Sequence, residues 1–273
     1  MPTPSLGTAL VTGASAGIGA VYAERLAQRG HDLVLVARDA ARLEALARRL
    51  EAETGRKVDI LPADLGQPAG IAAVERRLSK DSAITVLVNN AGMAVAGSAL
   101  EAEPARLAAM VQLNIVAAMH LALSGARVFK ARGKGTLINI SSVLALAPER
   151  FNGVYSGTKA FLLNLSQSLA AELHGSGVRV QAVLPGATRT AIWASAGVPV
   201  ENLPQEMVME AVEMVDAALA GLDAGELITI PSLPDAEDWE RLEEARLMLG
   251  PNLSRNRAAA RYRVSALGMS APV

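Results

Sequence analysis

The sequence predicts an α/β fold, a doubly wound parallel sheet of about seven strands with helices on both faces. Short β-branched runs alternate with longer alanine- and leucine-rich stretches of helical period, and this alternation is typical of a parallel sheet covered by helices. A glycine-rich stretch follows the first run, Thr8–Thr12, where a strand would turn into a helix. The chain has 273 residues, which suits one α/β domain with a tail.

The expected elements follow in order along the chain. The strands are each short enough to be buried in the sheet: Thr8–Thr12, Asp32–Ala37, Val58–Pro62, Thr85–Asn89, Gly135–Ser141, Val178–Leu184 and Leu227–Ile230. The helices are expected between and after them: Ile18–Arg29, Ala40–Thr54, Ala69–Ser79, Pro104–Ala131, Tyr155–His174 and Glu206–Ala220. We expect loops at Glu149–Gly153 and at Pro185–Pro204, where three prolines occur.

The pattern changes after Ile230. Pro231 and Pro234 precede a charged helix expected at Asp235–Leu249, and a tail rich in arginine and alanine follows. Without an internal repeat or a low-complexity linker, a second independent domain is not supported. We therefore expect a main domain over residues 1–231 and a helical C-terminal appendage of the same domain over residues 232–273.

Composition argues against several classes of function. The chain has no cysteine, so it forms no disulfide and uses no cysteine nucleophile. The three histidines lack metal-ligand spacing, and we predict no metal site; they are His31, His120 and His174. The formal net charge of -1 removes the usual electrostatic argument for nucleic acid as a partner.

Membrane and export signals are not expected either. Charged residues interrupt the apolar runs before they reach the roughly 18 residues that span a bilayer. Residues Met1–Gly7 carry no basic segment ahead of a long apolar run, as a signal peptide would. We expect a water-soluble, cytoplasmic protein that binds no membrane.

The glycine-rich turn is a candidate anion site. Its sequence is Gly13-Ala14-Ser15-Ala16-Gly17-Ile18-Gly19, between the first strand and the first helix. Backbone N–H groups at such a junction point at phosphates, and the helix dipole favours negative charge. The glycines would let the backbone approach a dinucleotide pyrophosphate, as in the Rossmann fold. Alone, such a turn could serve only chain reversal.

The residue after the second strand bears on the choice of dinucleotide. An acidic side chain there suits the ribose of NAD, whereas an arginine suits the 2′-phosphate of NADP. Arg38 occupies this position, and its guanidinium can pair with phosphate. An ordinary surface arginine is the alternative, and Asp39 beside it is a complication. We expect NADP, with NAD less favoured.

Two further stretches fit an adenosine pocket. Asp64 and Leu65 follow the third strand, and a carboxylate there could accept from the adenine amino group. Asn90-Ala91-Gly92 follows the fourth strand, where small residues would let the cofactor pass. Either stretch alone is also compatible with a simple turn.

A second group of residues points to proton chemistry. Tyr155 and Lys159 lie four residues apart at the start of an expected helix and so share a face. Ser142 lies at the end of the fifth strand, 13 residues before Tyr155. Ligands of open parallel sheets bind outside the carboxyl ends of the strands, where these side chains and the glycine turn would meet.

Over about Leu6–Pro231 the chain resembles the short-chain dehydrogenase/reductase family, in its type of roughly 250 residues. The motifs that carry the resemblance follow the family's order: the turn from Thr12 to Gly19, Asn89-Asn90-Ala91-Gly92, Asn114, Ser141-Ser142, Tyr155-x-x-x-Lys159 and Pro185-Gly186-x-x-x-Thr190. The resemblance implies a Rossmann-fold oxidoreductase that moves a hydride between NADP(H) and an alcohol or carbonyl carbon.

The resemblance also implies a role for each motif residue. Tyr155 would be the general acid in reduction and the general base in oxidation. Lys159 would stabilise the phenolate, since a free tyrosine has a pKa near ~10, and would bind the ribose. Ser142 would hold the substrate oxygen, and Asn114 a water that links Lys159 to solvent. The cofactor would also contact the residues after the sixth strand, Pro185, Gly186, Thr188 and Thr190.

The substrate wall is expected to be apolar. The segment Thr190–Gln205, with Trp193, resembles the family's mobile substrate loop. Together with Leu144 it could line a pocket for a hydrophobic carbonyl compound, as could Met93, Val95 and Phe151. Each of these apolar residues could equally belong to the core. Leu146 and Ala147 stand where a glycine often follows the serine.

Other functions and partners stay open. A non-catalytic, NADP-binding regulator or scaffold could use the same fold, and a Rossmann methyltransferase could use the glycine turn but has no need for Tyr-x-x-x-Lys. By resemblance we expect a homodimer or homotetramer that pairs the helices Pro104–Ala131 and Tyr155–His174. The basic tail residues suit a solvated face or a subunit contact: Arg255, Arg257, Arg261 and Arg263.

Overall fold

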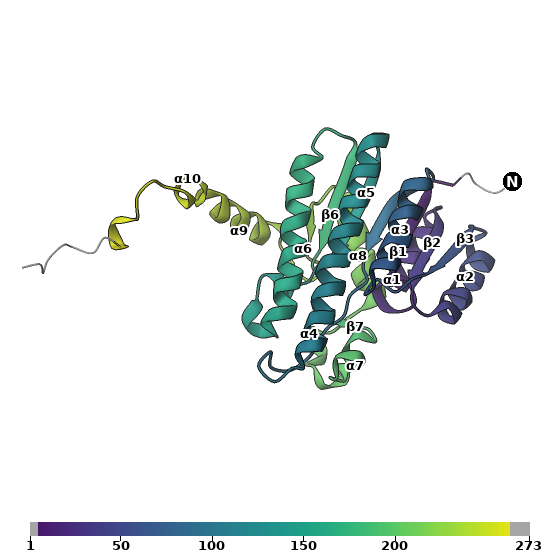
Figure 1. Ribbon diagram of the computed structural model, residues 1–273, viewed down its shortest axis with the longest axis horizontal. Helices are drawn as coiled ribbons and strands as arrows, with labels where there is room; N and C mark the ends of the chain where they lie inside the picture. Colours follow the sequence, from purple (N-terminus) through teal and green to yellow (C-terminus); the bar gives the residue numbers. More distant parts are fainter. Residues whose placement is uncertain (1–4, 263–273) are drawn as a thin grey trace, which may run out of the picture. The chain divides into compact units, whose positions relative to one another are not determined.

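The computed structural model describes residues 5–262, in two compact units that divide after Ser232. The first unit holds a seven-stranded sheet in the order β3-β2-β1-β4-β5-β6-β9 (Figure 1). All of its strand pairs are parallel. The strands are β1 (Thr8–Thr12), β2 (Asp32–Ala37), β3 (Val58–Pro62), β4 (Ile84–Asn89), β5 (Gly135–Ile140), β6 (Val178–Val183) and β9 (Ile228–Thr229).

Helices cover both faces of the sheet because alternate residues of each strand point to opposite faces. Val11 of β1 packs in a core with α1 (Gly17–Gln28), α2 (Ala40–Thr54) and α8 (Ala211–Asp223). Its neighbour Leu10 packs in the other core with α3 (Pro68–Lys80), α5 (Ala118–Arg132) and α6 (Gly153–Glu172). The doubly wound fold expected from the sequence is confirmed.

The long helix expected at Pro104–Ala131 is not a uniform α-helix. It consists of α4 (Pro104–Val111), a π-helical turn at Gln112–Ala117 and α5. Apolar periodicity indicates the helix but does not reveal the extra residue that widens one turn. Such π-turns interrupt the regular hydrogen bonding and often occur at functional sites. This turn contains Asn114.

The prediction of a loop over the whole of Pro185–Pro204 is wrong. It contains β7 (Thr188–Arg189) and α7 (Ile192–Ala196), and β7 pairs with β8 (Met209–Glu210). The helix expected to begin at Glu206 begins at Ala211 instead, because a 3-10 turn (Gln205–Met207) and then β8 occupy the preceding residues. Two-residue strands carry no readable alternation, and their pairing depends on contacts distant in sequence.

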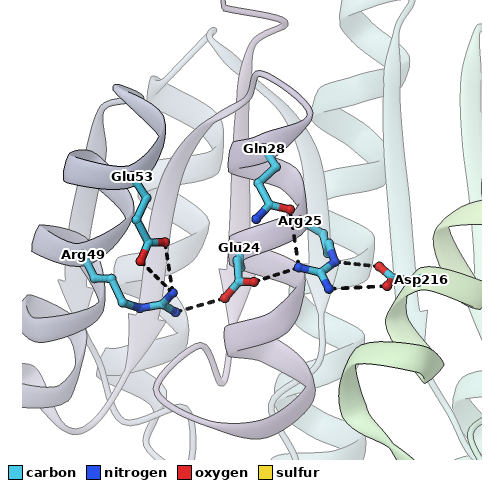
Figure 2. Close-up of polar contacts among 6 residues, drawn as sticks. All are labelled: Glu24, Arg25, Gln28, Arg49, Glu53 and Asp216. Atoms are coloured by element: carbon cyan, nitrogen blue, oxygen red, sulfur yellow. Dashed lines mark hydrogen bonds and ion pairs between the residues drawn. The ribbon is translucent and has the colours of Figure 1, made fainter.

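An ion-pair network joins three helices of the first unit (Figure 2). Arg25 of α1 contacts Asp216 of α8 at 2.7 Å through Nε, and its Nη1 contacts Glu24 at 2.7 Å. Arg49 of α2 contacts Glu24 at 3.1 Å and Glu53 at 3.1 Å. The network thus connects α8, the helix that follows the β7–β8 segment in the chain, to α1 and α2.

The second unit is helical, with α9 (Ala236–Met248) and α10 (Gly250–Leu253). Asp235 caps α9 by accepting a hydrogen bond from Glu237 N at 2.9 Å. Of its residues that the structure describes, 233–262, none is buried. Arg263 lies outside the described residues.

The expectation that charged residues interrupt every apolar run is wrong for one helical run: among the described residues, Pro104–Arg132 alone is long and apolar enough to cross a membrane. Length and composition are weak evidence, because core helices pass the same test. Leu121 and Phe129 of α5 are fully buried in the core, as in a helix that packs against a sheet.

Candidate active site

The glycine turn leaves the first turn of α1 open to an anion. Gly13 and Gly17 have φ angles of 66° and 55°, which side chains other than glycine adopt at a cost. A Cβ at Gly19 would collide with the Gly13 carbonyl. The N-cap residue Ala16 offers no side-chain cap, and the first turn of α1 holds no acidic residue. Its N–H groups therefore suit a phosphate.

Thr12 anchors the stretch after β4 to the end of β1. Its hydroxyl accepts hydrogen bonds from Asn90 N at 2.9 Å and Ala91 N at 3.0 Å. The Asn90 side-chain amide donates to the Thr12 carbonyl at 2.8 Å. Sequence reasoning gave Thr12 no role of its own. The signal that could have indicated this role is a hydroxyl side chain at a strand end, directly before a glycine turn.

The segment after β6 reaches the glycine turn and the serine. A Cβ at Gly17 would lie 3.1 Å from Thr190 Cγ2, so the Thr190 side chain lies against the turn. The Pro185 carbonyl accepts from Ser142 Oγ at 3.4 Å. Thr188 is buried and donates to the Gly186 carbonyl at 3.2 Å. The structure thus brings the segment after β6 together with Ser142 and the glycine turn. Its expected cofactor contacts are Pro185, Gly186, Thr188 and Thr190.

Tyr155, Lys159 and Ser142 converge at the carboxyl ends of β5 and β6. Lys159 Nζ lies 5.7 Å from the centroid of the Tyr155 ring and donates to the Ile140 carbonyl at 3.0 Å. Ser142 hydrogen-bonds the Tyr155 phenol and accepts from Leu144 N at 3.1 Å. A phenol, an ammonium and a hydroxyl thus form one small polar group in an apolar setting.

Burial dominates the electrostatics of this group. It raises the pKa of the Tyr155 phenol to about 12, against the opposing effect of the Ser142 hydrogen bond. It lowers the pKa of the Lys159 ammonium to about 8. The sequence had suggested that the lysine cation lowers the tyrosine pKa. In this arrangement, desolvation outweighs any such effect, and Tyr155 holds its proton.

Asn114 is buried beside Lys159. Its Oδ1 accepts from Met93 N at 2.9 Å, and its Nδ2 donates to the Met93 carbonyl at 2.9 Å and to Thr158 Oγ1 at 3.1 Å. A Cβ at Gly92 would lie 3.2 Å from Asn114 Oδ1 and 3.7 Å from Lys159 Nζ. The side chain is therefore paired with protein groups, and the water expected at Asn114 stays a prediction.

Arg38 is exposed just beyond the end of β2. Its neighbour Asp39 is engaged elsewhere, because its carboxylate accepts from Arg42 N at 3.0 Å and pairs with the Arg42 guanidinium at 3.2 Å. Asp39 thus caps α2, which resolves the complication seen in the sequence. The cationic side chain of Arg38, whose neighbouring carboxylate is engaged by Arg42, thus lies where a ribose substituent would be expected.

The residues after β3 fit an adenosine pocket less well. Asp64 is exposed, and its Oδ1 accepts from Gly66 N at 2.9 Å in a local turn. The Leu65 side chain is buried with α3 in the core. Only the backbone of Leu65 is therefore available to a cofactor. The position of Leu65 in the sequence does not show whether its side chain faces the core or the cofactor.

The structure places several residues of the expected substrate wall, of which Phe151 contacts Tyr155. Phe151 contacts the Tyr155 ring edge to face, with centroids 5.4 Å apart. The Trp193 indole donates to the Thr188 carbonyl at 2.8 Å. A cavity of about 450 Å³ is lined by Thr190, Trp193, Ala194, Gly197, Pro199, Val200 and Glu201. Val95 is buried in the protein, which favours a structural role for it.

Within residues 5–262, no group of three or more histidine or acidic side chains is arranged to hold a metal ion. The polar group at the sheet edge is built instead from a hydroxyl, a phenol and an ammonium. Fold and site together define the class of protein, an oxidoreductase on a doubly wound Rossmann sheet.

Comparisons with known proteins identify the family. A family model described as short chain dehydrogenase matches residues 7–199. Human 17-beta-hydroxysteroid dehydrogenase type 3 (Homo sapiens) is 34% identical over 186 residues, 67% of this chain and 60% of that protein. The match therefore spans less than two thirds of that relative. The chain belongs to the short-chain dehydrogenase family, as its motifs suggested.

Solved structures agree over nearly the whole chain. A short-chain dehydrogenase from Sphingobium yanoikuyae, in complex with NADPH, is 52% identical with a TM-score of 0.92, covering 94% of this chain and 100% of that one. The bulky-bulky ketone specific alcohol dehydrogenase from Comamonas testosteroni is 47% identical with a TM-score of 0.87, covering 94% and 99%. This coverage includes part of the C-terminal unit.

Proposed function

We propose that this protein is an NADP-dependent alcohol dehydrogenase or ketone reductase whose substrate is an apolar ketone, bulky on both sides of the carbonyl. The observation that carries the proposal is the meeting of Ser142, Tyr155 and Lys159 at the sheet edge next to the uncapped first turn of α1. The NADPH in one similar structure and the bulky ketone specificity of another support the cofactor and the substrate class.

The cofactor would supply and accept the hydride. Its pyrophosphate would lie on the N–H groups of Gly17, Ile18 and the rest of the glycine turn. Arg38 would pair with the 2′-phosphate. The other expected contacts are Ser15, Asp64, Leu65, Asn90, Ala91, Gly92, Pro185, Gly186, Thr188 and Thr190. No acidic residue in the first turn of α1 opposes an anion there.

Tyr155 would donate its phenolic proton to the carbonyl oxygen during reduction. Its raised pKa keeps this proton in place at neutral pH. Ser142 would hold the same oxygen from a second side and stabilise the charge that develops on it. Lys159 would stabilise the phenolate that remains. In oxidation, the same phenolate would accept the alcohol proton.

An apolar substrate would lie between Phe151, Leu144 and the segment around Trp193. The Phe151 ring already contacts Tyr155, so it would lie beside the reacting carbon. A homodimer or homotetramer that pairs α5 and α6 is expected from the family resemblance and remains a proposal. Action in the cytoplasm is proposed from the composition of the sequence, which has no cysteine.

The test is turnover of a graded series of ketones. The purified protein is mixed with NADPH and with ketones that carry small or bulky groups on each side of the carbonyl. The oxidation of NADPH is followed as the loss of absorbance of its reduced nicotinamide. Turnover of the bulky members is expected, with a higher kcat/KM than for acetone. Tight NADPH binding without turnover of any member would contradict the proposal and favour a regulator.

A further inference from the structure

Asn152 holds the backbone of the helical turn that carries Tyr155. Its Oδ1 accepts from Val154 N at 2.9 Å and from Tyr155 N at 3.4 Å. Its main-chain carbonyl accepts from Ser156 N at 3.1 Å. Three consecutive N–H groups around the proposed acid are therefore bonded to one residue. Sequence reasoning missed Asn152, although an asparagine just before an expected helix is a recognisable N-cap signal.

Asn152 is buried, with only 5% of its surface exposed, and its Nδ2 has no hydrogen-bond partner among the described residues. Serine would supply the capping oxygen without a second polar group to bury, and aspartate would suit the helix dipole better. The cap alone thus does not favour asparagine over these two residues. What distinguishes asparagine from aspartate at this position is that it is uncharged.

The neighbouring residue holds the Tyr155 side chain. Phe151 meets the Tyr155 ring at an interplanar angle of 74°. Asn152 fixes the backbone of Tyr155, and Phe151 borders its ring. The position of the phenol therefore depends on these two consecutive residues as well as on Ser142.

Few charges face the Tyr155 phenol. Lys159 on the same helix is 5.7 Å from the ring centroid, and Ser142 after β5 is uncharged. In the adjacent turn at Pro148–Arg150, Glu149 and Arg150 are exposed. Arg106 of α4, which also packs near α6, is exposed. A carboxylate at position 152 would thus introduce a buried negative charge at the backbone N–H of Tyr155, with few other charges near the phenol to offset it.

We propose that Asn152 is a positioning residue for the reaction, which orients Tyr155 by capping α6 with an uncharged oxygen. This inference rests on the proposed function of Tyr155 as the acid and base. A neutral cap fixes the phenol without opposing its ionisation, whereas a charged cap would fix it and also disfavour the phenolate. Geometry and charge at position 152 can therefore be tested separately.

The test uses three substitutions at this position. Asn152→Ala removes the capping oxygen, and we expect kcat to fall about 10- to 100-fold, since a small misplacement near the reacting atoms has such effects, with little change in KM. Asn152→Ser restores an oxygen acceptor, and we expect kcat within about threefold of wild type. Asn152→Asp keeps the cap and adds the charge.

The charge is detected in the pH profile of alcohol oxidation. A nearby anion stabilises the neutral phenol over the phenolate and so raises the pKa of Tyr155. On the ascending limb, at pH values below the Tyr155 pKa of about 12, kcat at a given pH should therefore be about tenfold lower in Asn152→Asp than in wild type, which corresponds to a limb moved to higher pH by about one unit. It should not move in Asn152→Ser. An unshifted limb in Asn152→Asp would overturn the role of charge.

A matched control separates this role from general stability. Asp235→Ala removes the cap of α9, and kcat should stay at the wild-type value. Loss of kcat in Asn152→Ala that Asn152→Ser fails to rescue would overturn the positioning role.

A second measurement needs no turnover. Amide hydrogen exchange at Val154 and Tyr155 should accelerate in Asn152→Ala and stay slow in Asn152→Ser. Accelerated exchange without any turnover in wild type would contradict the proposed function alone. Unchanged exchange in Asn152→Ala, with an active wild type, would contradict the inference alone.

Discussion

Lys159 Nζ lies 5.7 Å from the centroid of the Tyr155 ring and donates a hydrogen bond to the Ile140 carbonyl at 3.0 Å. Burial favours the neutral form of each group: it lowers the pKa of Lys159 to about 8 and raises the pKa of Tyr155 to about 12. Below pH 8 both groups therefore hold their protons. The protein without ligand is thus arranged to donate a proton from Tyr155.

The lowered pKa of Lys159 makes stability depend on pH. The unfolded lysine has a pKa of 10.5 and the folded one about 8, so between these values the unfolded state binds more protons. The free energy of unfolding should therefore rise with pH in this window. The burial penalty is fully present below pH 8, and it is on the order of 3 kcal/mol.

Lys159→Met isolates this effect because methionine is unbranched and uncharged. The free energy of unfolding of this variant should be higher than that of wild type. The difference should be largest below pH 8 and should shrink as pH rises to 10.5. Urea denaturation at a series of pH values measures it. A difference that is constant with pH would contradict the burial of a charged lysine.

Arg38 should determine the choice between the two nicotinamide dinucleotides. Arg38→Asp removes the guanidinium that would pair with the 2′-phosphate and places a carboxylate where it repels this phosphate and can accept from a ribose hydroxyl. We expect the ratio of kcat/KM for NADPH over NADH to fall by about 100-fold or more. Arg48→Asp, on the same helix α2 but paired with Glu44 rather than with Asp39, is a control. An unchanged ratio in Arg38→Asp would remove Arg38 from the site.

Gly17 should be sensitive to a single methyl group. Its φ of 55° is strained for alanine, and a Cβ there would lie 3.1 Å from Thr190 Cγ2. Gly17→Ala is therefore expected to destabilise the protein by about 1 to 2 kcal/mol and to weaken NADPH binding. Fluorescence titration with NADPH measures the second effect, with Gly55→Ala as a control for positive φ away from the site. Equal NADPH affinity in both variants would argue against the glycine turn as the phosphate site.

The Arg25–Asp216 pair in Figure 2 should contribute modestly to stability. Its side chains are 21% and 50% exposed, so solvent screens their attraction. A double-mutant cycle with Arg25→Ala and Asp216→Ala should give a coupling of about 0.5 to 1 kcal/mol that declines with salt. A coupling that salt leaves unchanged would mean that the pair is not held by screened charge attraction.

Much of this fold could be predicted from the sequence because its signals are local. The apolar runs of β1 and β2 and the helical period of α2 depend on residues close together in the chain. The seven strands of the main sheet were expected within one or two residues of their observed ends. The pairing of β7 with β8 was missed, since it joins Thr188 to Met209 across a segment without periodicity.

The site was predictable for a different reason. Tyr155 and Lys159 share a helix face by spacing alone, and Ser142 joins them because parallel strands end at one edge of the sheet. Hydrogen bonds between elements could not be predicted from the sequence. The pairing of Asn114 with Met93 and the cap that Asn152 forms depend on how the chain folds around them, as does the burial that determines the pKa of Tyr155.

The most direct test of the central claim compares wild type with Tyr155→Phe. The phenyl ring keeps the shape of the site but has no proton to donate, so kcat for ketone reduction with NADPH should fall by about 100- to 10,000-fold. NADPH affinity should stay within about threefold. The account predicts loss of turnover with retained binding, and a variant that reduces the ketone at the wild-type rate would contradict it.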